Sequence, residues 1–201
     1  YSNEGALYIS DDFEVTDALK IHAGLRYSSF QHSGYISFRD YIKNDFQSND
    51  DNYRHIEPRL SFRYRLSPSS SIKGAYTQNY QYVHLASTSS VSLPTDLWVP
   101  SSSEIKPKFA DQYAIGYFKN LSDNMYETSI EAYYKEMTNL LEYKEGVLPE
   151  DNTNSSSDGS FAFGDGDSYG IEVLLKKNKG KTTGWIGYTL SKTTKYFDEV
   201  N

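Results

Sequence analysis

The sequence predicts an all-β fold, an antiparallel transmembrane β-barrel segment of about eight strands. Three observations lead to this prediction. Apolar and polar residues alternate with a period of two over long stretches, which is the pattern of strands with one apolar face. The connections between these stretches are alternately short and long. Aromatic residues make up 15% of the 201 residues, including 19 tyrosines, although the mean hydropathy is only −0.68.

The first four strands form two hairpins, and each alternates clearly. Strands are expected at residues 6–15 and 19–30, joined by a short turn, and at 56–66 and 72–82, joined by a serine-rich turn. The strand at 56–66 shows the strongest contrast. Apolar side chains occupy one of its faces, and Glu57, Arg59, Arg63 and Arg65 lie on the other.

The last four strands are expected at residues 109–120, 125–146, 168–178 and 183–197, again as two hairpins with short turns. Long polar connections separate the four hairpins, at residues 31–52, about 85–108 and 147–167. These connections are rich in serine, asparagine, aspartate and glycine, which is the composition of loops.

Alternation of short and long connections favours a membrane barrel. A soluble meander offers no reason for every second connection to be long, whereas an outer-membrane barrel has short periplasmic turns and long extracellular loops. Several strands exceed the ~9–11 residues that a tilted strand needs to cross a bilayer. Lipid would cover the apolar face, and the arginines would face a lumen filled by water or protein.

Composition argues against several other classes of protein. The net charge of −7 and the pI near 5.1 disfavour nucleic acid as a partner. Cysteine is absent, so a disulfide-stapled secreted scaffold is not expected. The first residues, YSNEGALYIS, lack a secretory signal, and the chain reads as the middle of a longer protein.

The segment EGALYISDDFEVTDALKIHAGLRYSSF resembles the barrel of TonB-dependent outer-membrane receptors, especially the Bacteroidetes-type branch, through the run Gly24-Leu25-Arg26-Tyr27. EPRLSFRYRLSPSSSIKGAYTQNYQ resembles the next hairpin of that family. IKPKFADQYAIGYFKNL with ETSIEAYYKEMTNLLEYKEG, and GDGDSYGIEVLLKKNKGKTTGWIGYTLSKT, resemble the later ones. The similarity covers nearly the whole chain and is strongest in the strands.

This resemblance implies a receptor that captures a scarce nutrient (a siderophore, vitamin, glycan or peptide) and imports it across the outer membrane of a Gram-negative cell. Residues 1–201 would be part of a barrel that has about 22 strands in the family. The plug domain is absent from this chain. The expected partners are the TonB–ExbB–ExbD complex acting through the plug, the lipid bilayer, the nutrient and a surface lipoprotein. No enzymatic activity and no cofactor are expected.

The sequence contains no motif that supports catalysis or metal binding. The four histidines, His22, His32, His55 and His84, have no metal-ligand spacing. The serines form no G-x-S-x-G motif. Asp158, Asp165 and Asp167 suggest calcium, but they do not follow the EF-hand order, and turn-forming residues of a loop explain them equally.

The ligand-binding candidates lie in the expected extracellular loops: Asp96, Trp98, Phe161 and Phe163. Trp98 can stack on a sugar or an aromatic ligand, or can fold over the barrel mouth as a packing anchor. The two phenylalanines can face a ligand or cover the strand ends. The expected lumen-facing charges are Arg26, Glu57, Arg59, Arg63, Arg65, Glu131 and Glu172, with cross-strand ion pairing as their simplest role.

Two alternative classes stay open at this point. The first is a small eight-stranded outer-membrane barrel that acts as an adhesin or anchor. The second is a soluble β-sandwich that binds carbohydrate, although a sandwich would not line an inward face with three arginines.

Overall fold

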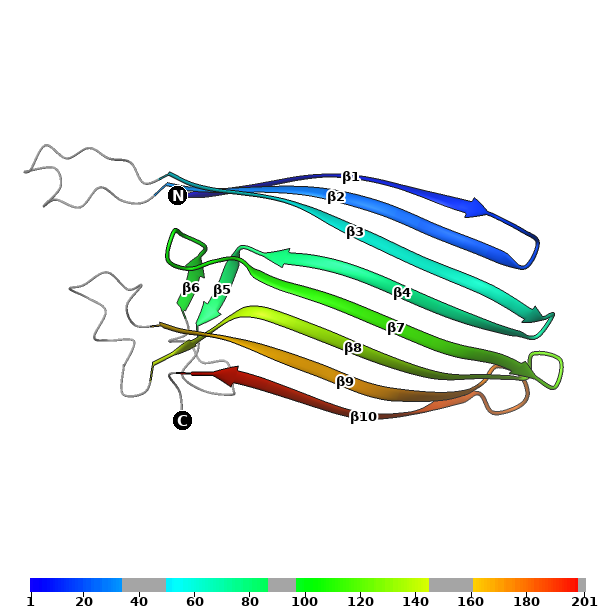
Figure 1. The fold of residues 1–201 in the computed structure, drawn as a ribbon. Helices are drawn as coiled ribbons and strands as arrows, with labels where there is room; N and C mark the ends of the chain where they lie inside the picture. Colours follow the sequence, from blue (N-terminus) through cyan, green and yellow to red (C-terminus); the bar gives the residue numbers. More distant parts are fainter. Residues whose placement is uncertain (34–49, 87–96, 145–160, 199–201) are drawn as a thin grey trace, which may run out of the picture.

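The strands of one large antiparallel sheet determine the architecture of the protein (Figure 1). The computed structural model describes residues 1–33, 50–86, 97–144 and 161–198. The eight strands of the large sheet, in spatial order, are β1 (Ser2–Glu14), β2 (Leu19–Ser33), β3 (Asp50–Ser67), β4 (Ser70–Gln81), β7 (Lys108–Leu121), β8 (Tyr126–Tyr143), β9 (Phe161–Lys177) and β10 (Gly184–Phe197). A second sheet has two strands, β5 (Val83–Ala86) and β6 (Leu97–Pro100).

Four tight connections lie at one end of the sheet, which we call the turn end; the other end is the loop end (Figure 1). In the first connection, the Thr16 hydroxyl accepts a hydrogen bond from the backbone N–H of Leu19, a local bond that favours a turn. The β7–β8 turn uses left-handed backbone at three positions, Ser122, Asp123 and Asn124. Gly180 (φ 110°) serves the β9–β10 turn, because its conformation is one that other residues adopt only with strain.

The expected fold class is confirmed, with several strands longer than the sequence suggested and β8 shorter. β3 begins at Asp50 rather than at residue 56, and β9 begins at Phe161 rather than at residue 168. The third long connection is therefore shorter than predicted. The connection at 85–108 contains β5 and β6, which sequence alternation did not reveal.

Directly opposed residues form rows that cross the sheet, and each row lies on one face. One apolar row contains Phe13, Ile21, Phe62, Gly74, Ile115, Ala132, Ile171 and Leu190. We call the face on which this row lies the apolar face. Its side chains are largely uncovered: Ile115 is 57% exposed and Leu190 64%.

The sheet is open in the part of the chain that the structure describes. β1 and β10 lie at its two edges and do not pair with each other. An eight-stranded barrel closed on itself would require that pairing, so the small-barrel alternative is not favoured. Nor do two large sheets pack face to face, as a sandwich would require. Among the described residues, no helix is long and apolar enough to cross a membrane.

Candidate functional site on the polar face and at the loop end

The face opposite the apolar one, which we call the polar face, carries all seven charged residues predicted to line a lumen. The strand register brings several of these residues directly opposite one another. One row contains Glu14, Lys20, Arg63, Lys73, Gly116, Glu131, Glu172 and Thr189. Arg26 and Glu57 oppose each other in a second row. Arg59 opposes Gly24, and Arg65 opposes Ser71.

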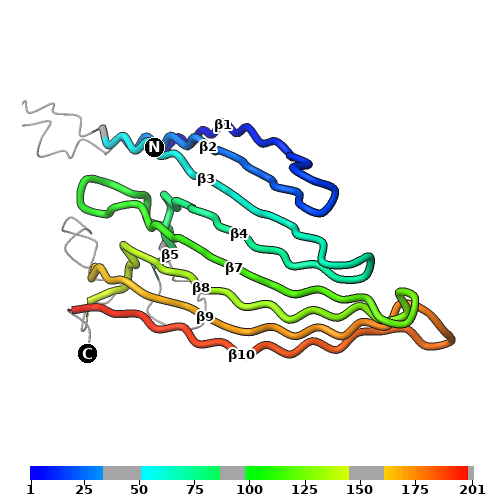
Figure 2. Tube along the Cα trace, turned by 45° about the vertical axis from the view of Figure 1, so that its right-hand side comes forward, coloured from blue at the N-terminus to red at the C-terminus, as the bar shows by residue number. Residues whose placement is uncertain are grey.

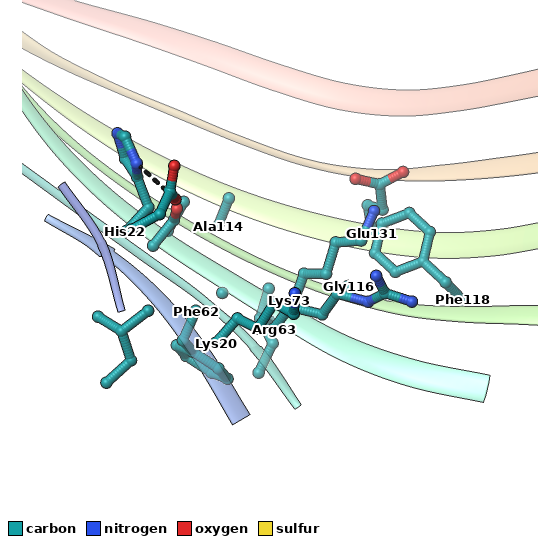
Figure 3. A pocket seen from close by; sticks show the side chains of 15 residues that line it. Lys20, His22, Phe62, Arg63, Lys73, Ala114, Gly116, Phe118 and Glu131 are labelled. Carbon is teal, nitrogen blue, oxygen red and sulfur yellow. Dashed lines mark hydrogen bonds and ion pairs between the residues drawn. The ribbon is translucent and has the colours of Figure 1, made fainter. Parts of the chain in front are cut away.

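A hollow of about 480 Å³ lies over this face toward the turn end and is lined partly by basic and acidic side chains (Figure 3). Lys20, Arg63 and Lys73 contribute from three neighbouring strands, and Glu131 lies beyond Gly116. Three cations directly opposite one another repel, since like charges in cross-strand positions are destabilising. The hollow is therefore suited to an anionic group.

Local contacts hold two of these cations in place. The ammonium of Lys73 lies 4.0 Å from the centroid of the Phe118 ring, a cation–π contact. Lys20 pairs with the Glu14 carboxylate on the adjacent strand. Within the described residues no ion pair neutralises Arg63.

The acidic part of the row lies on β8 and β9. Glu131 and Glu172 are direct cross-strand partners, so two carboxylates occupy positions where like charge costs free energy. The Ser129 hydroxyl donates a hydrogen bond to Glu131 at 3.1 Å. In the described ranges neither carboxylate has a cationic partner, which leaves this pair suited to a cation from outside the chain.

Other polar-face charges pair within the sheet, as their simplest role predicts. Arg26 lies between Glu4 at 3.8 Å and Glu57 at 3.7 Å, and Glu57 is only 3% exposed. Arg59 donates a hydrogen bond to the side-chain oxygen of Asn79 at 3.3 Å. Pairing thus neutralises the charges near the loop end of β2 and β3 more fully than those of the Lys20–Glu172 row.

The loop-end candidates divide into buried and exposed residues. Phe161 is 2% exposed and packs against Tyr143, with ring centroids 5.0 Å apart. Phe163, two residues along β9, is 40% exposed. Trp98 lies on β6 opposite Leu85 and is 64% exposed, whereas its neighbour Val99 is buried. Asp96 lies outside the described residues.

Val99, rather than Trp98, is the packing anchor of this segment. Val99 and Ala86 from the two-stranded sheet join Ile105, Leu141, Tyr143 and Phe161 in one buried cluster. Asn139 reinforces the contact by donating a side-chain hydrogen bond to the carbonyl of Pro107 at 3.0 Å. The segment from β5 to Pro107 is thereby packed onto the loop end of β8 and β9.

A buried histidine and two lysines lie beside this cluster. His84 is fully buried, and its Nε2 lies 2.9 Å from the Ser101 hydroxyl. Burial lowers the pKa of His84 to about 4, and Lys108 acts in the same direction. Burial also lowers the pKa of Lys108, with a further contribution from Lys195. Lys195 forms an ion pair with Glu142 at 2.6 Å.

Among the described residues no group of three or more histidine, aspartate or glutamate side chains is arranged to hold a metal ion. Asp165 and Asp167 lie in β9. Asp158 lies outside the described part of the chain.

Comparison with known proteins gives one family. The family model described as "TonB dependent receptor-like, beta-barrel" matches residues 1–201. No curated protein matches the sequence.

Solved structures match the fold at low sequence identity. The FrpB iron transporter from Neisseria meningitidis superposes with a TM-score of 0.67 at 14% identity, over 98% of this chain and 26% of that one. The alcaligin outer-membrane receptor FauA from Bordetella pertussis gives 0.61 at 17% identity, over 100% and 32% of the two chains. The ferripyoverdine receptor of Pseudomonas aeruginosa gives 0.65 at 17% identity, over 100% and 24%. The chain therefore spans about a quarter to a third of the length of these relatives.

Proposed function

Since this chain belongs to the family of TonB-dependent receptor-like β-barrels, we propose that it forms part of the wall of an outer-membrane receptor. The complete receptor binds a scarce nutrient at the cell surface and imports it with energy supplied through TonB. The family is one of transport receptors, and we assign no covalent chemistry to this chain. We further propose the Bacteroidetes-type branch, on the basis of Gly24-Leu25-Arg26-Tyr27 and the surrounding hairpin.

The observation that carries this proposal is the two-sided sheet. An apolar row crosses all eight strands and is exposed, while the neighbouring row on the other face is charged. An apolar surface of this extent is not stable in water. A bilayer would cover the apolar face, and the polar face would line a lumen.

The charged row supports a lumen that is filled by another protein domain. The charges of that domain would be opposite in sign to those of the row that they face. Arg63 and Lys73 have no carboxylate partner among the described residues and suit anionic partners, whereas Glu131 and Glu172 suit a cationic one. We assign both to the plug domain, which lies outside this chain. Through that plug the receptor would contact the TonB–ExbB–ExbD complex.

The loop end is the proposed ligand surface. Trp98 and Phe163 present exposed aromatic rings there, and Asp96 is kept as a candidate beside them. Aromatic faces suit planar or sugar-like ligands. The solved relatives are named for iron, alcaligin and ferripyoverdine, which makes a ferric siderophore the first ligand class to test. A surface lipoprotein is a further proposed partner at this end.

The test is uptake by cells that produce the full-length receptor. Radioactive ferric siderophores, vitamin B12 and fluorescent oligosaccharides are offered in turn, and accumulation is compared with that of cells lacking the receptor. We expect one class to accumulate, and we expect its accumulation to stop when TonB is deleted or the proton gradient is collapsed. Accumulation that persists without TonB would overturn the proposed mechanism. Surface adhesion without any uptake would instead favour an adhesin.

A further inference from the structure

The sheet has a seam between β3 and β4 at the loop end. Backbone pairing of the two strands runs from the turn end only as far as Arg59 and Thr77. β3 nevertheless continues to Asp50, and β4 continues to Gln81. Figures 1 and 2 both show the two strands diverging beyond this point. Side chains, rather than the backbone ladder, must therefore connect β3 to the next part of the wall.

Tyr82 lies in this seam and makes the connection. Its hydroxyl is 2.6 Å from the Ser28 hydroxyl on β2 and 2.9 Å from Nδ1 of His55 on β3. Its ring stacks on Phe30, with centroids 5.1 Å apart and planes 3° from parallel. Tyr82 is 2% exposed and Ser28 is fully buried, so the contact between their hydroxyls is shielded from water, and the contact with His55 is partly buried.

Tyr82 also lies at the base of the two-stranded sheet, immediately before β5. Its carbonyl accepts a hydrogen bond from the backbone N–H of Ser101, the residue after β6, at 2.7 Å. The Tyr53 hydroxyl on β3 donates to the carbonyl of Ser102 at 2.6 Å. The base of the β5–β6 ribbon, where β5 begins and β6 ends, is therefore fixed to the β2–β3 side of the seam.

The opposite side of the ribbon is held by the apolar cluster that contains Val99 and Phe161. Trp98, between Leu97 and Val99, is left exposed between the two attachments. An exposed indole on a ribbon with two attachments is held in one position, which lowers the ordering cost of binding a ligand.

We propose that Tyr82 is the positioning residue of the ligand surface: its hydroxyl clasps Ser28 and His55 across the seam and so fixes the ribbon that presents Trp98. The role assigned to Trp98 rests on the proposed function. The claim that the Tyr82 hydroxyl fixes the position of the β5–β6 ribbon can be tested without any ligand.

Tyr82→Phe is the sharpest variant, because it keeps the ring and its stacking and removes only the hydroxyl. Loss of a buried hydrogen bond of about 1.4 kcal/mol corresponds to about a tenfold rise in the detached ribbon population. Tyr76→Phe is the matched control. It removes a hydroxyl from the neighbouring strand β4, one that donates to the Asp111 carboxylate on β7 at 2.7 Å and makes no contact across the seam.

Spin-label spectroscopy of the full-length receptor in membranes measures the mobility of the β5–β6 ribbon. This chain has no cysteine, so Trp98→Cys supplies a single labelling site within it for a nitroxide. A second labelled protein carries the nitroxide at Trp185→Cys, near the turn end. We expect Tyr82→Phe to increase the mobile component about tenfold at position 98 and to leave position 185 unchanged. Tyr76→Phe should change neither.

An unchanged spectrum at position 98 in Tyr82→Phe would overturn the proposal, and so would equal mobilisation at positions 98 and 185. The result is independent of uptake. A receptor that imports nothing but shows the selective mobilisation would refute the proposed function and keep the clasp. A receptor that imports a nutrient but lacks the mobilisation would do the reverse.

Discussion

Two buried polar side chains at the loop end each have a specific hydrogen-bond partner. The Ser28 hydroxyl forms a hydrogen bond with the Tyr82 hydroxyl, and Nε2 of His84 forms one with the Ser101 hydroxyl. A buried polar group without a partner costs more free energy than a made hydrogen bond returns, so these contacts constrain the ribbon strongly. They also make the ribbon sensitive to protonation, because a buried imidazole accepts a proton only at a cost.

His84 gives a pH prediction with a definite sign. Burial lowers its pKa to about 4 in the folded protein, whereas the unfolded chain takes up the proton near pH ~6.5. The unfolded state therefore binds more protons between these values, and the free energy of unfolding falls as the pH falls through this window. At pH 5 the expected loss for the ribbon is about 1–2 kcal/mol.

Hydrogen-exchange protection of the β5 and β6 amides, corrected for intrinsic rates, measures this loss at pH 7 and pH 5. His84→Gln removes the titrating group and should abolish most of the difference. If His84→Gln retains the full pH dependence, the titrating group is another one.

At the scale of elements, the ends of the strands depart from the regular ladder. The β8–β9 register shifts between Met137 and Leu140, and Asn139 within this bulge has a left-handed φ of 57°. The extra residue redirects the loop end of β8, where Leu141 and Tyr143 enter the buried cluster. The bulge therefore provides one of the two attachments of the β5–β6 ribbon.

Two substitutions at position 139 separate backbone strain from hydrogen bonding. Asn139→Gly tolerates the left-handed conformation and loses only the bond to Pro107, so we expect a loss of about 1 kcal/mol. Asn139→Ala adds the cost of left-handed backbone, about 1–2 kcal/mol, for a total of about 2–3 kcal/mol. Denaturant unfolding of the purified receptor measures both. Equal losses in the two variants would mean that the backbone conformation at this position is not strained for alanine.

The strands and their faces could be predicted from the sequence because alternation is a direct consequence of strand geometry. The same rule failed at Tyr82. Alternation along 72–82 places this residue on the same face as Tyr76 and Tyr80, but β4 ends at Gln81 and the Tyr82 side chain turns into the seam toward His55. Lys20 and Lys73 are not among the lumen-facing residues expected from the sequence. Their importance depends on register with Arg63, which no single strand reveals.

For the whole molecule, the apolar row and the adjacent charged row lie on opposite faces of the sheet. They indicate lipid on one side of the wall and a lumen on the other. The apolar row and the charged row are offset by one residue in every strand. A shift of one residue in any strand pair would bring charge into the apolar face, so this arrangement specifies the register strongly. It also means that the same substitution at two neighbouring positions of one strand should change the stability of the receptor differently, because the two side chains lie on opposite faces.

Leu190 and Thr189 on β10 test this opposition. Leu190 belongs to the apolar row, and we expect Leu190→Arg to destabilise the receptor by about 2–4 kcal/mol if this face meets the bilayer midplane. Thr189 lies on the polar face opposite Glu172, so Thr189→Arg should be neutral or stabilising because it supplies a cation to the Glu131–Glu172 pair. Unfolding of the full-length receptor reconstituted in lipid vesicles measures both variants. Comparable losses at the two positions would contradict a wall with lipid on one side and a lumen on the other. A loss at Thr189 alone would place lipid on the charged face and reverse the assignment of the two sides.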